Sequence, residues 1–182
     1  MMRRVFTMGI CLILSFGWLF SVPPQSTEKT EDAFIIKDVN PFYYCSLHKK
    51  GPYSLMSGAI GELWLLMQKQ GIHPTGTLFG VYLNSPQMVE EVALEWLVAI
   101  PISDLPEPKA PLEKKKWTFE RVVSGIHTGP YDKVGETLQE MMNWLLKNGH
   151  SIAGPILEKY LTTPRPDSDP AQNKTEIWIP IR

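Results

Sequence analysis

Cysteine is scarce in this chain and cannot supply a disulfide framework. Cys11 falls inside an N-terminal apolar run, and Cys45 is the single cysteine in the rest of the 182 residues. Because a framework needs several paired cysteines, the fold must depend on a hydrophobic core. The four histidines are scattered and no Cys-x-x-Cys pair is present, so the spacing of a metal site is missing. We therefore expect neither a metal nor another cofactor.

An excess of either charge is also missing. The chain holds 18 Lys and Arg residues and 19 Asp and Glu residues, for a net charge of -1. A nucleic-acid-binding surface usually shows as a basic excess, so we expect no nucleic acid among the partners. A phosphate-binding glycine loop and a clear nucleophile motif are absent too, which disfavours a conventional enzyme. The hydrophobic content of 43% suits one domain of ordinary size.

The N-terminus carries a long apolar segment. Arg3 and Arg4 precede an apolar run over residues 5–22, the layout of a signal peptide or a signal-anchor helix. Small residues are missing at the positions before a cleavage site, which favours an uncleaved anchor. With the arginines inside, the domain lies outside the cytoplasm on a single-pass anchor. The alternative is a cleaved leader and a secreted or periplasmic protein. Residues 1–22 are thus the expected leader, and the polar residues 23–33 the expected tether.

An internal repeat relates two halves of the remaining chain. When the sequence is shifted by 78 residues, Gly51-Pro52-Tyr53 falls on Gly129-Pro130-Tyr131. Residues 51–86 then show ten identities with the shifted copy, against about two expected by chance. The other identical pairs are Glu62/Glu140, Lys69/Lys147, Gly71/Gly149, Gly76/Gly154, Tyr82/Tyr160, Leu83/Leu161 and Pro86/Pro164.

Each half is expected to hold one β-α-β-β unit. In the first half, apolar residues recur at helical spacing from about residue 54 to 70, and Gly71 stops the helix. The predicted fold class is α+β, a tandem β-α-β-β repeat with antiparallel sheets, one main helix per module and a pseudo-twofold axis between the modules. The domain 34–182 divides into repeat one (about 34–102), an exposed connector (103–116) and repeat two (about 117–182).

The last strand carries the most informative candidate residue, Glu176. Side chains alternate along a strand, so Ile177 and Ile179 are expected to face the helix while Glu176 and Trp178 share the other face. Alternation does not decide which face Glu158 and Tyr160 take, because both parities of residues 156–161 carry apolar residues. Tyr82 and Tyr160 are equivalent in the repeat, as two walls of a shared groove would be. We therefore predict a groove between the modules that holds Glu158, Tyr160, Glu176 and Trp178, with Tyr82 opposite.

A carboxylate beside aromatic rings suits two kinds of chemistry. Each ring contributes about 0.5–2 kcal/mol of cation-π attraction to a lipophilic cation, and the carboxylate adds charge in a low dielectric. Alternatively, a desolvated Glu with a raised pKa acts as a general acid or base while a Tyr hydroxyl orients a substrate. The structural alternative is an exposed Glu176 on an edge strand and a Tyr160 that only packs.

Four stretches of the chain resemble the GyrI-like small-molecule-binding family, which includes effector-binding domains of AraC- and MerR-type multidrug regulators. They are His127-Thr-Gly-Pro-Tyr-Asp-Lys-Val-Gly-Glu, Trp144-Leu-Leu-Lys-Asn-Gly, Gly154-Pro-Ile-Leu-Glu-Lys-Tyr-Leu and Thr175-Glu-Ile-Trp-Ile-Pro-Ile. The resemblance covers about residues 34–182. It implies two modules about a pseudo-dyad, with Glu176 lining the groove among aromatics and Glu158 and Tyr160 forming part of its wall. Some stand-alone members are similar to hydrolases of cyclopropane-bearing compounds, and this implies Glu176 and Tyr160 as catalytic candidates.

Three functions follow as hypotheses. The first is a stand-alone domain that binds amphipathic or cationic small molecules, because the helix-turn-helix of the regulators does not precede it in this sequence. The second is a small hydrolase that uses Glu176 and Tyr160. The third is a protein-interaction domain of a membrane-anchored receptor. The sequence makes no prediction of the oligomeric state or of the identity of a ligand.

Overall fold

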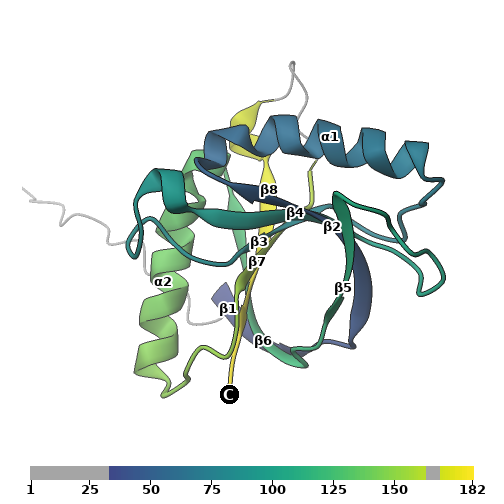
Figure 1. Cartoon of the computed structure of the whole chain (residues 1–182). Coiled ribbons are helices and arrows are strands. Elements are labelled where there is room, and N and C mark those ends of the chain that lie inside the picture. The colour runs from purple at the N-terminus through teal and green to yellow at the C-terminus, as the bar shows by residue number, and fades with distance from the viewer. Residues whose placement is uncertain (1–32, 163–168) are drawn as a thin grey trace, which may run out of the picture.

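The structure, a computed structural model, describes residues 33–162 and 169–182 of the chain (Figure 1). It contains one antiparallel sheet of eight strands with two helices, α1 (Met56–Lys69) and α2 (Val134–Lys147). The predicted α+β class with an antiparallel sheet is therefore confirmed. The expected leader at residues 1–22, and all of the expected tether except residue 33, lie outside the described residues.

The strands follow one another in the sheet in the order β1-β6-β8-β7-β3-β4-β2-β5. Their bounds are β1 (Phe34–Asp38), β2 (Phe42–Lys50), β3 (Phe79–Tyr82), β4 (Glu95–Pro101), β5 (Leu112–Trp117), β6 (Arg121–Thr128), β7 (Ile156–Tyr160) and β8 (Lys174–Pro180). Both helices follow a 3-10 turn, Tyr53–Leu55 before α1 and Tyr131–Lys133 before α2. In this strand order, β3 and β7 pair with each other at the middle of the sheet.

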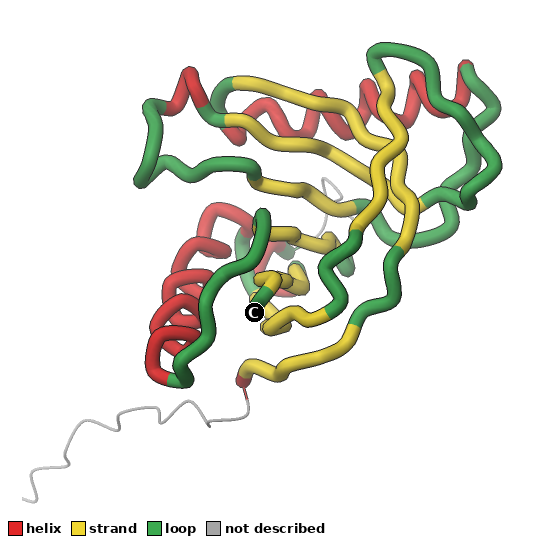
Figure 2. The backbone as a smooth tube through the Cα atoms, turned by 60° about the horizontal axis from the view of Figure 1, so that its bottom comes forward, coloured by secondary structure: helices red, strands yellow, loops and turns green. Residues whose placement is uncertain are grey.

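A long two-stranded ribbon joins the two ends of the sheet. β1 and β2 run almost without interruption along β6 and β5, in one antiparallel register from Phe34↔Gly125 to Leu47↔Leu112. Figure 2 shows the two strands side by side, each with a short loop partway. At that break the Val39 N–H still donates to the Glu120 carbonyl oxygen, at 2.7 Å. Because β2 also pairs with β4 and β6 with β8, the ribbon holds both halves of the sheet.

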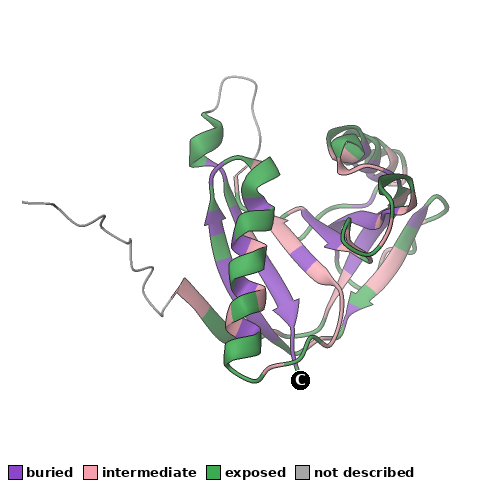
Figure 3. Cartoon of the chain, turned by 90° about the vertical axis from the view of Figure 1, so that its left-hand side faces the viewer, coloured by how far each residue is buried: buried purple, intermediate pink, exposed green. Residues whose placement is uncertain are grey.

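The helices cover the outer strands of one face and leave the middle pair between them. α1 packs on β2 and β4 through residues spaced four apart, Ala59, Leu63 and Met67, because residues at this spacing share one side of a helix. α2 packs on β6 through Met141 and Leu145. Figure 3 shows the outward sides of both helices exposed and the strands beneath them largely buried. β3 and β7 lie between the helices, as Figure 1 shows.

The other face of the sheet has its own hydrophobic core, made of side chains from seven strands. Its buried members are Tyr44, Phe79, Val81, Leu97, Ala99, Trp117, Val122, Leu157 and Trp178. Aromatic rings dominate: Phe42 stacks on Trp117 with ring centroids 6.3 Å apart and meets the Trp178 ring edge-on at 6.5 Å. Trp178 is therefore part of a packed core rather than the wall of an open groove.

The connector between the halves differs from its predicted form. Residues 103–116 are rich in proline and charge, yet Leu112–Trp117 form the edge strand β5. Buried Leu112 and Trp117 anchor this strand at its two ends, while Lys114 pairs with Asp104 at 3.0 Å and Glu107 at 2.9 Å. These two residues are five apart and belong to the cores of opposite faces, so the segment shows no apolar alternation that would have marked it as a strand.

Candidate functional site

The two candidate carboxylates lie on opposite faces of the sheet. β7 and β8 pair with Glu158 opposite Ile177 and with Lys159 opposite Glu176. Ile177 packs in the core beneath α2, so Glu158 shares the helix-covered face, and Glu176 has the opposite parity. The predicted single groove containing Glu158, Tyr160, Glu176 and Trp178 is therefore not formed. The structure brings Glu158 together with Tyr160 and Tyr82, and it brings Glu176 together with Trp178.

On the helix-covered face, Glu158 ends a short chain of hydrogen bonds. The Tyr82 hydroxyl donates to Glu158 Oε2 at 2.8 Å, and it lies 3.1 Å from the Tyr160 hydroxyl. All three side chains are partly buried between α1 and α2. Gly80 makes room for them, because a Cβ atom there would lie 2.8 Å from the Tyr160 hydroxyl oxygen.

Two further tyrosines, which the sequence reasoning did not assign to the site, extend this cluster. The Tyr53 ring meets the Tyr82 ring edge-on at 5.0 Å, and the Tyr131 ring meets the Tyr160 ring edge-on at 5.7 Å. Both come from the Gly-Pro-Tyr turns before the helices, so their shared motif was the signal that pointed to them. We call Glu158 with Tyr53, Tyr82, Tyr131 and Tyr160 the tyrosine cluster.

Glu158 has an unusual electrostatic position within the tyrosine cluster. Burial raises the pKa of its carboxyl to about 7, although the hydrogen bond from Tyr82 acts in the opposite direction. Among the described residues no Lys, Arg or His forms an ion pair with it. Burial and the nearby carboxyl also raise the pKa of Tyr160, so this hydroxyl stays protonated at neutral pH. The cluster therefore contains an acid that is close to half ionised at pH 7 and lacks a counter-ion.

Glu176 is in the opposite situation, because two lysines neutralise it. Lys37 on β1 donates to Glu176 Oε1, the Ser124 hydroxyl donates to the same oxygen at 2.9 Å, and Lys159 Nζ lies 3.5 Å from Oε2. The Glu176 side chain is only 13% exposed, so the alternative of an exposed carboxylate does not hold.

The lysines also cover Trp178. Their ammonium nitrogens lie 4.4 Å (Lys37) and 4.0 Å (Lys159) from the Trp178 ring centroid, within cation-π range. We call Lys37, Lys159, Glu176 and Trp178 the lysine cluster. Burial alone would raise the pKa of Glu176, but the donors Lys37, Trp178 and Ser124 and the Lys159 charge outweigh it and lower the pKa to about 2. The buried indole N–H of Trp178 has no hydrogen-bond partner by geometry, so the lowered pKa depends chiefly on Lys37, Ser124 and Lys159.

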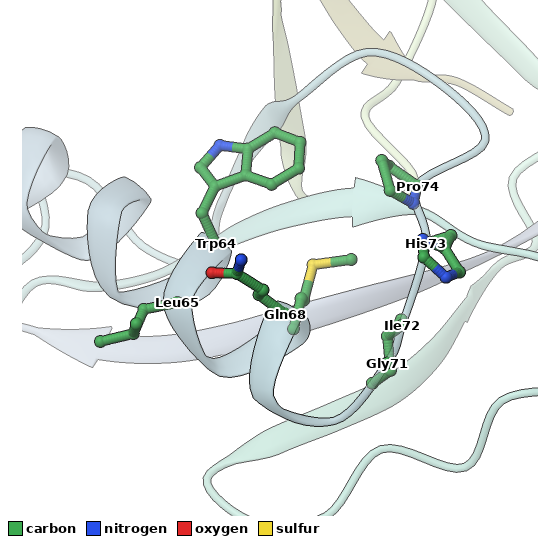
Figure 4. Close-up of a pocket in the computed structure, with 8 residues that line it drawn as sticks. Trp64, Leu65, Gln68, Gly71, Ile72, His73 and Pro74 are labelled. Atoms are coloured by element: carbon green, nitrogen blue, oxygen red, sulfur yellow. The ribbon is translucent and has the colours of Figure 1, made fainter.

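Two shallow apolar pockets lie away from both carboxylates. One, of about 460 Å³, is formed where α1 ends and includes Trp64, Gln68 and His73. Figure 4 shows that its other lining residues come from the end of α1 and the segment that follows. The second, of about 350 Å³, lies at the end of α2 and includes Met142 and His150. Neither pocket holds an acidic residue, and in the described part of the chain no three His, Cys, Asp or Glu side chains are arranged to hold a metal.

Solved structures share this fold. The isolated C-terminal domain of EcmrR is 20% identical with a TM-score of 0.74, and the match covers 82% of this chain and 96% of that one. In the EcmrR–DNA complex (20% identity, TM-score 0.73) the match covers 81% of this chain but only 56% of EcmrR. A hydrolase from Listeria innocua is 17% identical (TM-score 0.61, 82% and 91% covered). SAV2435 bound to tetraphenylphosphonium is 12% identical (TM-score 0.56, 82% and 93% covered).

These findings contradict two predictions, one about nucleic acid as a partner and one about the location of the protein. The exclusion of nucleic acid is wrong as a general statement, because the same fold occurs in EcmrR bound to DNA. The prediction of a single-pass membrane protein or a secreted or periplasmic one is also contradicted, because the proteins that share the fold include this DNA-bound one. Within residues 33–162 and 169–182, no helix is long and apolar enough to cross a membrane. The apolar run at residues 5–22, on which that prediction depended, lies outside this part.

The family itself follows from the sequence match. A comparison with curated proteins finds no match. The family described as GyrI-like small molecule binding domain matches residues 33–182, the whole of the domain described above. The chain therefore belongs to the GyrI-like small-molecule-binding family.

Proposed function

We propose that this protein binds amphipathic, cationic small molecules at the tyrosine cluster, with Glu158 as the acidic group. The observation that carries the proposal is a partly buried carboxylate that touches tyrosines and has no basic partner among the described residues. Family membership supports small-molecule binding, and tetraphenylphosphonium in the similar structure of SAV2435 is a lipophilic cation.

The tyrosine cluster has the physical properties that such a ligand needs. Four rings offer π faces and apolar area, and each contact with a cation is worth about 0.5–2 kcal/mol. An unpaired carboxylate in a partly desolvated position gains more from a cation than an exposed one does. Glu176 and Trp178, predicted as ligand-binding residues, are weaker candidates because Lys37 and Lys159 already occupy the place of a cation.

We also infer that the tyrosine cluster lies at the junction of two duplicated modules. α1 and α2 begin and end at residues 78 apart, as do the two 3-10 turns, and β4 and β8 are 79 apart. At the offset of 78 residues Gly80 corresponds to Glu158, and these two residues are paired with each other across β3 and β7. A duplicated site would thus keep a single acid, with the second position left as glycine, and this suits a ligand with one positive charge.

Titration of the full-length protein with tetraphenylphosphonium by calorimetry tests the proposal. We expect binding that weakens at least tenfold in Glu158→Gln, since this change removes the negative charge and keeps the shape. Glu176→Gln is the matched control on the other face and should bind the cation with nearly the native affinity. Loss of binding in Glu176→Gln with no effect of Glu158→Gln, both folded by circular dichroism, would reject the assignment.

A second candidate is hydrolysis. The predicted pair, Glu176 and Tyr160, lies on opposite faces and does not meet, whereas Glu158, Tyr82 and Tyr160 form a continuous hydrogen-bonded chain. A carboxyl with a pKa of about 7 suits general acid or base catalysis at neutral pH. We would therefore assay turnover of strained, cyclopropane-bearing electrophiles. Turnover that persists in Glu158→Gln would exclude this mechanism.

A further inference from the structure

The lysine cluster carries one positive charge more than it neutralises. Lys37 and Lys159 share a single carboxylate, Glu176, and among the described residues no other acidic side chain pairs with either ammonium. The side chains are 31% (Lys37), 23% (Lys159) and 13% (Glu176) exposed, so solvent compensates the surplus charge only in part. A partly desolvated charge without a partner is unfavourable. The cluster therefore has room in its charge balance for one anion.

Both lysines are held where they can share an acceptor. Each ammonium lies over the same Trp178 ring, and each also contacts Glu176. An ammonium group has three N–H donors, and these contacts do not use all of them. Phosphate and carboxylate oxygens accept charge-assisted hydrogen bonds from two cations at once. A small anionic headgroup is the chemistry that fits.

Apolar side chains border the lysine cluster on the same face. Ile126 lies directly across from Glu176 in the β6–β8 pair, and Ile35 lies across from Ser124 in the β1–β6 pair. Ser124 binds Glu176, which places these residues on the Glu176 side of the sheet. The two isoleucines are 49% (Ile126) and 56% (Ile35) exposed, so an alkyl chain laid over them would bury apolar surface.

We propose that the lysine cluster is a second ligand site, selective for an amphipathic anion: an alkyl chain ending in a phosphate or carboxylate. The headgroup lies between Lys37 and Lys159, and the chain covers Ile35 and Ile126. Cations are excluded here, because the two ammonium groups repel them more than Glu176 attracts them. The charge preference of this face is thus opposite to that of the tyrosine cluster.

The test compares octyl phosphate with octyltrimethylammonium, which share a chain and differ in charge. The full-length protein is titrated with each by calorimetry, and the Trp178 indole N–H resonance, identified with Trp178→Phe, reports the location. We expect octyl phosphate to bind and to shift this resonance. Its affinity should fall about tenfold in Lys159→Gln and rise several-fold in Glu176→Gln, because the second change removes a competing carboxylate.

Several outcomes would overturn the proposal. They are undetectable octyl phosphate binding, an unchanged affinity in Lys159→Gln, equal affinity for inorganic phosphate, and preferential binding of octyltrimethylammonium with a shift of the Trp178 resonance. Lys159→Gln keeps the Lys37–Glu176 pair, so it tests the site even where Glu176→Gln does not fold. Glu158→Gln should change only cation binding, and this separates failure here from failure of the tyrosine cluster proposal.

Discussion

Glu158 and Glu176 are the same residue type on neighbouring strands, yet their surroundings shift their pKa values in opposite directions. Burial without a cation raises the pKa of Glu158 to about 7. Glu176 is also partly buried, but donors and lysines lower its pKa to about 2. The difference teaches that burial alone does not decide the state of a carboxylate; the supply of counter-charge from other strands does. On one face of the sheet Glu158 has no ion-pair partner among the described residues, and on the other Glu176 is paired with two lysines.

The largest expected effect comes from removing the satisfied acid. Glu176→Gln leaves two lysines facing each other and should lower the free energy of unfolding at pH 7 by about 2–3 kcal/mol. The folded pKa is below the unfolded value, so this stabilisation is present above about pH 5 and is lost as the pH falls toward 2. Urea unfolding at pH 7 and pH 3 measures it. Equal stabilities of variant and native protein at pH 7 would show that Lys37 and Lys159 contribute nothing through this pair.

A smaller effect of opposite sign is expected for the unsatisfied acid. The folded pKa of Glu158 is raised, so its ionisation opposes folding as the pH increases from about 4.5 through 7. Glu158→Gln removes this penalty and should raise the free energy of unfolding at pH 8 by about 2 kcal/mol, with little change at pH 4. Urea unfolding at pH 8 and pH 4 provides the measurement. A variant less stable than the native protein at pH 8 would mean that Glu158 has a cationic partner.

The smallest effect concerns ligand affinity. A cation prefers the ionised form of Glu158, so binding of tetraphenylphosphonium should strengthen about tenfold between pH 6 and pH 8. Octyl phosphate also gains charge in this range, because the second pKa of a phosphate monoester is about 6. Its pH profile should nevertheless be the same in Glu158→Gln as in the native protein, because the Glu176 carboxyl is ionised throughout that range. Calorimetry at three pH values between 6 and 8 measures the affinity of each ligand. A pH profile of octyl phosphate that changes in Glu158→Gln would place both ligands at one site.

Part of this arrangement was predictable from the sequence. The alternation in the last strand correctly separated Glu176 and Trp178 from Ile177 and Ile179, because only one parity there is aliphatic. The same reasoning could not place Glu158, since both parities of β7 carry apolar residues and both faces of the sheet are covered by core. A strand that is buried on both faces has no alternating polar residues from which its orientation could be predicted.

The lysines of the second face could not be found from local patterns. Lys37 and Glu176 are 139 residues apart, and their contact depends on β1 pairing with β6 and β6 with β8. Lys37 lies outside the quoted motifs and the aligned residues. Lys159 lies within the Gly154–Leu161 stretch, but the repeat matches it to Val81, so neither the repeat nor the spacing singled it out. The strand β5 was missed for a related reason: its lysines resemble those of an exposed connector, and its pairing with β2 is settled at long range.

The ribbon that joins the ends of the sheet makes the folding of each half depend on the other. β1 belongs to the first half but finds its strand partner only in β6, and β5 leaves the connector to pair only with β2. Neither half can therefore complete its edges alone, and assembly must wait for contacts between residues about 90 positions apart, which slows folding relative to local structure. In return, a cut in the exposed connector near Leu105 would leave two fragments still joined by three strand pairs, β1–β6, β2–β5 and β3–β7.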